Sequence, residues 1–474
     1  MSEEHIVQPK ITFLDEEDRE RVHGYTLEIL TKTGVRVDSP QACDLVRQKL
    51  GDSVVDGERV RFPPEAVEWA LQTAPSWVDI YDRRGELAFR LGEDRTRFGI
   101  GVTTLFYQDP MTDQLTPFTR RNLQDMVRLG SRLKNFDVIS TVGIVQDVPT
   151  EICDEVATLE MAANTTKPLV LLVSDEHKFP AVLDLLEALH GDLAARPFVL
   201  PFFNPVTPLV FNQGTVDKMW DSIRRGLPVI FSNYSLAGMS TPITPAGTLA
   251  LLMAEILGGL TLSQLMQEGA PMILGIEPAF FDMKTMVNFY DPQSMLVNLA
   301  CIEMMRHYRL PHCGTSGSGT GWGGDLLASE TYWMNHITTL LAHGGLAPFV
   351  GDTLGSKAFS ATNVVYVHEI IEQALRLWQG FRLDEASVGL DEIEQAGPGG
   401  NFLMSPTTLK RFRQAYYTSP IFPRWSMEKW QKQGSPTVDQ TLRSHTLALL
   451  ADLPVPEDHD ELIRKGEWLI KPGG

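Results

Sequence analysis

Polar and aromatic residues follow short apolar runs along the chain, and several of them belong to types that carry chemistry. The carboxyl groups of Glu277 and Asp352 could serve as an acid and a base, and aromatic faces could hold a cation. If the apolar runs are parallel strands of a barrel, the residues at their carboxyl ends meet at one face. The substrate-site candidates chosen on this ground are Phe106, Tyr107, Asn204, Tyr234, Glu277, Phe280, Trp322, Phe349 and Asp352.

Recognition of an anion would need a different set of donors. His312, Lys357 and the backbone of the glycine-rich run 314–324 are the available ones. Glycine permits close backbone approach, so this run could present a row of N–H groups, although a plain flexible loop explains it equally well. The run lacks the closing Lys-Ser/Thr of a phosphate-binding loop, which argues against a bound nucleotide.

No metal site is expected within the chain. His312 and Cys313 are neighbours on a predicted strand and would point to opposite faces. His336 and His343 lie on one predicted helix without a carboxylate or thiolate partner at ligand spacing. The GxSxG and HExxH signatures of common hydrolases are absent from the sequence.

The composition describes an acidic globular protein. The 474 residues include 60 acidic and 41 basic side chains, giving a formal charge of −19, and 43% of residues are hydrophobic. This balance argues against a nucleic acid or an anionic membrane as partner. The first ten residues do not resemble a signal peptide. Four scattered cysteines without a CxxC pair favour a reducing compartment, so we expect a cytoplasmic protein.

One segment indicates the architecture that positions these candidates. A short β-rich run at 229–233 is followed by an apolar helix at 245–268 and a second run at 272–276. Thr244 can cap the helix and Pro245 suits its first position. The helix is apolar on nearly every side, which favours a buried core helix over a membrane span. Such a strand, helix and strand form a right-handed unit of a parallel sheet.

The same alternation repeats eight times and predicts a (β/α)8 TIM barrel over residues 97–380. We expect an N-terminal extension of helices and hairpins over 1–96 and a C-terminal wrap packed on the barrel over 381–474. The predicted strands are 97–101, 138–145, 169–174, 198–204, 229–233, 272–276, 312–315 and 347–352. The predicted helices lie near 119–135, 150–165, 176–190, 213–225, 245–268, 291–308, 325–343 and 362–380.

Three motifs give the chain a family resemblance. They are Leu-Ala-Gly-Met-Ser-Thr-Pro at 236–242, Gly-Pro-Gly-Gly-Asn-Phe-Leu at 397–403, and the segment 425–430 ahead of Gly434. The chain resembles the trimethylamine methyltransferase superfamily over nearly its whole length. That resemblance implies a (β/α)8 barrel that moves a methyl group from an amine to the cobalt of a separate corrinoid protein. The founding members carry pyrrolysine in the barrel, whereas this chain contains only standard residues.

The members without pyrrolysine that the chain resembles most act on quaternary amines, glycine betaine foremost. A quaternary nitrogen already carries the charge that makes it a leaving group, so no general acid is expected. Its charge fades towards the transition state, so aromatic and weakly polar contacts are expected near it rather than an ionised carboxylate. No DxHxxG motif for binding a corrinoid is present, so cobalamin would come with a partner protein.

Several alternatives remain open at this point. The amine could be carnitine, choline or proline betaine. The chain could bind an amine without catalysis, or act as a barrel lyase or hydrolase through Glu277 and Asp352. A symmetric homo-oligomer is the ordinary expectation for a soluble enzyme.

Overall fold

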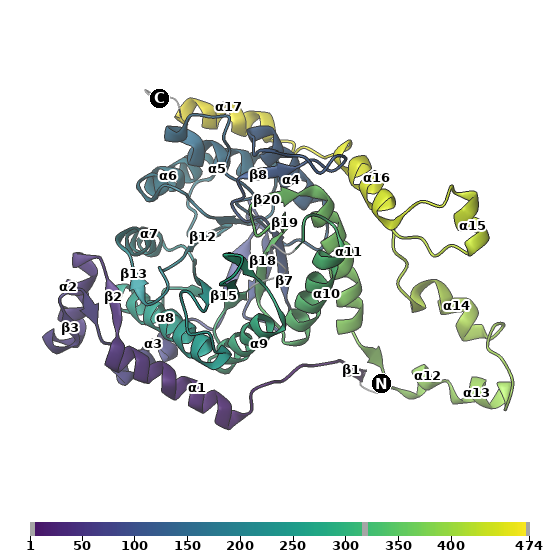
Figure 1. The fold of residues 1–474 in the computed structure, drawn as a ribbon, viewed down its shortest axis with the longest axis horizontal. Helices are drawn as coiled ribbons and strands as arrows, with labels where there is room; N and C mark the ends of the chain where they lie inside the picture. Colours follow the sequence, from purple (N-terminus) through teal and green to yellow (C-terminus); the bar gives the residue numbers. More distant parts are fainter. Residues whose placement is uncertain (1–4, 315–320, 471–474) are drawn as a thin grey trace.

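Eight parallel strands close into a barrel in the computed structural model, which describes residues 5–314 and 321–470 (Figure 1). Neighbours in space follow the order of the chain, and pairing of the last strand with the first closes the ring. The predicted barrel is therefore confirmed. Its strands are β7 (Arg97–Ile100), β10 (Val138–Ser140), β11 (Leu169–Leu171), β12 (Val199–Phe203), β14 (Val229–Ala237), β15 (Met272–Asp282), β17 (His312–Gly314) and β18 (Leu346–Val350).

A ring of helices surrounds the strands, one after each of them. These helices are α4 (Arg120–Arg132), α5 (Cys153–Asn164), α6 (Phe179–His190), α7 (Gln213–Arg224), α8 (Pro245–Met266), α9 (Pro292–His307), α10 (Leu326–Leu341) and α11 (Ala361–Trp378). Helix α8 starts where predicted, with the Thr244 side chain accepting from the backbone N–H of Gly247. It is long and apolar enough to cross a membrane, but 89% of its most apolar window is buried in the protein, as befits a core helix.

Strands β14 and β15 extend farther than the sequence indicates. They pair in register over nine residues, from Val229 opposite Met272 to Ala237 opposite Phe280. The sequence places their ends at 233 and 276, because polar and glycine residues follow there. Those residues instead keep the strand conformation beyond the barrel, and β16 (Val287–Phe289) folds back antiparallel onto β15. The extended pair and its hairpin form one wall above the barrel mouth.

Smaller elements cover the rest of the barrel. Helices α1 (Glu16–Glu28), α2 (Pro40–Leu50) and α3 (Pro64–Thr73) pack against α8, and strands β5 (Val78–Tyr81) and β6 (Leu87–Leu91) form a hairpin within the predicted N-terminal extension. A second hairpin, β8 (Phe106–Gln108) with β9 (Leu115–Pro117), joins a small sheet with β19 (Asp352–Thr353) and β20 (Ala358–Ser360). This sheet stands beside the carboxyl end of β18.

The C-terminal segment packs on the barrel only in part. Helix α16 (Val438–Leu450) lies against α4 and α11, and α17 (His459–Ile470) lies against α5 and α6. In contrast to the expected wrap, the helices between β21 (Phe381–Arg382) and α16 project sideways from the barrel (Figure 1). They are short, and none of them has a buried residue. These helices are α12 (Glu385–Val388), α13 (Leu390–Ala396), α14 (Pro406–Ala415) and α15 (Met427–Lys432).

Candidate active site

A cavity of about 1160 Å³ opens at the carboxyl ends of the barrel strands. This is the end at which barrel enzymes carry their active sites. Aromatic side chains form much of its wall, and they come from β12, β14, β15, β16, β18 and the loop before α10. The six that concern us are Phe202, Tyr234, Phe281, Phe289, Trp322 and Phe349.

The aromatic wall combines a rigid part with an exposed part. Phe202 and Phe349 meet edge to face, with ring centroids 5.1 Å apart and planes at 75°, and both are almost completely buried. Trp322 is 73% exposed. Faces of this kind attract a cation through the negative face of the ring. A cationic group entering the cavity would therefore meet fixed rings within the barrel and an accessible indole.

Glu277 is the only carboxylate among the lining residues that the structure describes. Its side chain faces the cavity, and Ser232 Oγ donates a hydrogen bond of 3.2 Å to Oε1. Burial raises the pKa of Glu277 to about 8, the Ser232 hydrogen bond opposes this rise, and the negative charge of Asp352 adds to it. At neutral pH the carboxyl of the free protein is therefore mostly protonated and uncharged.

Two polar neighbours hold the region around Glu277 in place. Asn288 Nδ2, from β16, donates a hydrogen bond of 2.7 Å to the hydroxyl oxygen of Tyr234. Asn204 Nδ2 donates a hydrogen bond of 3.1 Å to the backbone oxygen of Ser232, whose side chain donates to Glu277. Burial raises the pKa of Tyr234, so its hydroxyl stays neutral. Near Glu277 the cavity thus offers neutral polar groups.

Lys357 is the only cationic side chain among the described residues that line the cavity. It is exposed, and its backbone oxygen accepts from the N–H groups of Leu105 and Phe106 at 3.1 Å each. These bonds fix the chain at the start of β20. The cavity therefore combines aromatic faces and an uncharged carboxyl with a single accessible positive charge.

Five of the predicted site residues do not line this cavity. Phe280 packs on its register partner Phe289 and is not a lining residue, whereas Phe281, which shares the face of Glu277 by alternation along β15, lines the cavity. Phe106 and Tyr107 belong to the small sheet beside the mouth. The two others, Asp352 and His312, are buried among barrel residues.

Asp352 and His312 form hydrogen bonds within the barrel and do not line the cavity. The backbone oxygen of Asp352 accepts a hydrogen bond of 3.1 Å from Tyr332 Oη. The negative charge of the Asp352 side chain raises the pKa of Glu277, although Asp352 does not line the cavity. His312 begins β17, so it lies at the opposite end of the barrel. Its Nε2 accepts from the Gly345 N–H at 3.0 Å, and burial lowers its pKa to about 4. Its position is wrong for an anion-binding residue at the mouth.

Sequence reasoning missed several residues of the site. Ser232 and Asn288 were not selected, and Phe281 was passed over in favour of its neighbour Phe280. The period of two along β15 could have identified Phe281. The hairpin that carries Asn288 gave no signal, because residues 283–286 (Met-Lys-Thr-Met) contain no glycine, proline, asparagine or aspartate that would mark a turn. In the glycine-rich run, residues 315–320 lie outside the described residues, and Gly321 and Trp322 line the cavity.

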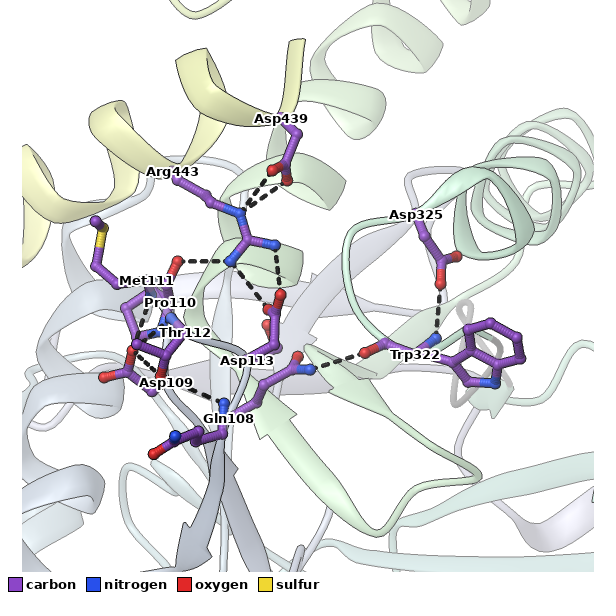
Figure 2. Close-up of polar contacts among 12 residues, drawn as sticks. Gln108, Asp109, Pro110, Met111, Thr112, Asp113, Trp322, Asp325, Asp439 and Arg443 are labelled. Atoms are coloured by element: carbon purple, nitrogen blue, oxygen red, sulfur yellow. Dashed lines mark hydrogen bonds and ion pairs between the residues drawn. The ribbon is translucent and has the colours of Figure 1, made fainter. Parts of the chain in front are cut away.

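A hydrogen-bond network supports Trp322 from behind (Figure 2). Gln108 Nε2 donates a hydrogen bond of 2.7 Å to the Trp322 backbone oxygen, and the Trp322 N–H donates one of 2.8 Å to Asp325 Oδ2. From α16, Arg443 binds both carboxylate oxygens of Asp113, at 3.0 and 2.8 Å, and the backbone oxygen of Pro110. Helix α16 thus holds the β8–β9 hairpin that carries Gln108.

Comparison with known proteins gives consistent results. The family description "Trimethylamine methyltransferase (MTTB)" matches residues 3–464. A glycine betaine methyltransferase of Desulfitobacterium hafniense strain Y51 is 26% identical over 481 residues, covering 98% of each chain. A trimethylamine methyltransferase of D. hafniense strain DSM 10664 / DCB-2 is also 26% identical, over 93% of this chain and 90% of the relative.

A solved structure resembles the fold. The monomethylamine methyltransferase of Methanosarcina barkeri aligns with a TM-score of 0.54 over 94% of this chain and 89% of its own, at 9% identity. At that identity the likeness concerns the arrangement of the barrel and its extensions.

Proposed function

Because the chain belongs to the trimethylamine methyltransferase family, we propose that it moves a methyl group from a quaternary amine to the reduced cobalt of a separate corrinoid protein. The chain is a methyltransferase, and the substrate we propose is glycine betaine, which would leave as dimethylglycine. The relatives with matching length include a glycine betaine methyltransferase, which supports this choice of substrate class.

The observation that carries the proposal is the pairing of aromatic walls with one cation in the same cavity. Phe202, Phe349 and Trp322 offer faces for a trimethylammonium group, and Lys357 offers a positive charge for a carboxylate. Glycine betaine has these two groups one carbon apart. A neutral amine would gain little from Lys357, and a simple quaternary amine would gain nothing from it.

The state of Glu277 fits the electronic demand of the reaction. An ionised carboxylate would stabilise the cationic substrate more than the transition state, in which the charge on nitrogen fades. In the free protein the pKa of Glu277 is raised to about 8, so at pH 7 the cavity that receives the substrate is mostly without a carboxylate charge. The Glu277 carboxyl can contact the substrate as a polar but uncharged group.

The residues at the mouth suit a methyl acceptor brought by another protein. When bound, a reduced corrinoid supplies the nucleophilic electron pair that takes the methyl carbon. Exposed apolar side chains stand around the opening, and such patches commonly mark interaction sites. They include Met239, Met286, Val287 and Trp322. The task of this chain is to hold the substrate with one methyl group facing the opening and to exclude water.

The experiment follows the visible spectrum of a reduced corrinoid protein mixed with this chain and one amine at a time. The amines are glycine betaine, carnitine, choline, proline betaine and trimethylamine. We expect a spectral change with glycine betaine, together with stoichiometric dimethylglycine by mass spectrometry. A change with another of these amines alone would replace the proposed substrate. Tight betaine binding with no spectral change would indicate a binding protein, and turnover without any corrinoid would indicate a lyase or hydrolase.

A further inference from the structure

The segment that projects sideways from the barrel has no buried residue over a long stretch. We call residues 383–433 the lateral arm. From residue 381 to residue 420 every described side chain is exposed or only partly buried. The arm is tied to the barrel near its middle, where Tyr417 Oη donates 2.7 Å to Glu369 Oε2 and Phe422 packs edge to face on Tyr366. Ile421 is buried in the core beside these contacts, the N–H of Leu383 donates to the backbone oxygen of His5 at 2.9 Å, and Arg376 of α11 donates to the backbone oxygen of Gln414. The helices of the arm have no buried residue.

The arm is ordered as helices that could not persist alone. They contain 4, 7, 10 and 6 residues, whereas isolated helices below roughly 12–15 residues are marginal in water. Most of helical stability in proteins comes from packing of an apolar face. The arm has such faces and leaves them uncovered. Its exposed large apolar side chains include Leu390, Ile393, Leu403, Met404, Leu409 and Phe412.

Charge is divided sharply along the arm. Between residues 384 and 396, across α12 and α13, there are five carboxylates and no cation. Between residues 406 and 433, across α14 and α15, there are six cations and one carboxylate. The basic half is notable in a chain whose formal charge is −19. One arm therefore carries two surfaces of opposite sign, each with apolar side chains beside the charges.

A surface of this kind is complementary to a second copy of itself. In a two-fold dimer the same patch meets itself in reverse, so the acidic half of one arm faces the basic half of the other twice over. The exposed stretch also exceeds the roughly 20–30 residues that each partner contributes to a stable interface. Figure 1 shows the arm beside α10 and α11, lateral to the ring of strands and helices. A partner bound there would sit beside the barrel.

We propose that the lateral arm is the homodimerisation surface of this protein. Helices α12 and α13 of one copy lie against α14 and α15 of the other, with the apolar side chains packed between them. In this arrangement the barrel mouth stays accessible to the corrinoid protein that the proposed function requires.

Charge exchange between the two halves tests this arrangement on the full-length chain. One variant reverses the acidic half with Asp391→Lys and Glu394→Lys, and the other reverses the basic half with Lys410→Glu and Lys429→Glu. All four side chains are exposed. Sedimentation velocity should show a dimer for the wild type at micromolar concentration. Each variant alone should dissociate at least tenfold more readily, and an equimolar mixture of the two should form dimers again.

A control pair, Glu457→Lys with Glu461→Lys, applies the same charge change to exposed residues outside the arm and should leave the dimer intact. Far-ultraviolet circular dichroism and the melting temperature check that the variants keep the barrel. The proposal is overturned if the wild type is monomeric. It is equally overturned if both arm variants remain dimeric, or if the mixture stays monomeric. Loss of corrinoid-protein binding with unchanged assembly would assign the arm to that partner instead.

Discussion

Tyr234 and Glu277 are register partners on β14 and β15, and both side chains face the cavity at the barrel mouth. Both strands continue past the barrel at this point, so the pair stands on the wall that rises above it. Two residues directly opposite each other on neighbouring strands are held at a fixed separation. A neutral hydroxyl and a mostly neutral carboxyl are thereby presented together, beside aromatic rings. The state of that carboxyl sets the first two predictions.

Ionisation of Glu277 should lower both kcat and KM of the wild-type enzyme. Above a pH of about 8 the carboxyl of the free protein loses its proton. The negative charge then stabilises the bound ammonium more than the transition state, so KM should fall and kcat should fall with it. Glu277→Gln keeps a neutral polar group, so it should retain activity at pH 7 and show neither change between pH 7 and 9. Steady-state kinetics with glycine betaine measure both. A rise of kcat through pH 8 in the wild type would contradict this role and support Glu277 as a base.

Buried carboxyls should also make the protein less stable as the pH rises. The folded-state pKa of Glu277 is raised to about 8, and that of Glu255 to about 7, both chiefly by burial. In the unfolded chain these groups ionise near pH 4.5. Between pH 4.5 and the folded values the folded protein therefore holds more protons, and the free energy of unfolding falls with pH.

Each group accounts for a slope of up to about 1.4 kcal/mol per pH unit. Urea unfolding from pH 5 to pH 8 should show a shallower decline for Glu277→Gln than for the wild type, up to the upper end of this window. For Glu255→Gln the difference should end near pH 7. Glu330→Gln, at an exposed position, serves as the control. Parallel curves for wild type and both buried variants would show that these carboxyls are ionised in the folded state.

The sequence indicated the barrel because its strands are short, continuous apolar runs buried on both sides. It did not indicate the extension of β14 and β15, where Ser235 on one strand and Glu277 and Pro278 on the other interrupt the apolar pattern although pairing continues. Alternation of side chains along β15 was enough to select Phe281 over Phe280 as the residue that lines the cavity. His312 was proposed as a donor to an anion, but it begins its predicted strand at 312–315 and therefore lies at the opposite end of the barrel from the strand ends that carry the site. The lateral arm was unpredictable, since composition alone does not say which surface an apolar side chain covers.

Lys357 should be needed for betaines and not for amines without a carboxylate. A hydrogen bond to a charged group contributes about 1.5–3 kcal/mol, so Lys357→Met should raise the Kd for glycine betaine roughly 10- to 100-fold. Binding of choline, which has no carboxylate, should change little. Lys357→Arg should recover part of the affinity. Isothermal titration calorimetry of the three proteins with both ligands makes the comparison. An equal loss for choline would mean that Lys357 supports the fold of the mouth and does not contact the carboxylate.

Arg443 should hold Trp322 in position from a distance. Its guanidinium binds both oxygens of Asp113, and the same hairpin carries Gln108, whose side chain donates to the Trp322 backbone oxygen (Figure 2). Arg443→Met removes the paired hydrogen bonds and should let the loop with Trp322 move more freely, which weakens the aromatic wall. We expect betaine affinity to fall a few-fold, in keeping with a loss of about 1 kcal/mol for a partly exposed pair. Arg443→Lys keeps the charge without the bidentate geometry and should lie between wild type and Arg443→Met.

Quenching of Trp322 fluorescence measures the movement of this loop independently of catalysis. Trp322 is 73% exposed, so an aqueous quencher such as acrylamide reaches it. The difference in quenching between a protein and its Trp322→Phe counterpart isolates the signal of this indole. That difference should increase in the Arg443→Met background, and a bound betaine should reduce it in the wild type by covering the ring. Gln108→Ala breaks the last link of the network and should reproduce the increase with Arg443 intact. Unchanged quenching in both variants, together with a lowered melting temperature, would confine Arg443 to anchoring α16.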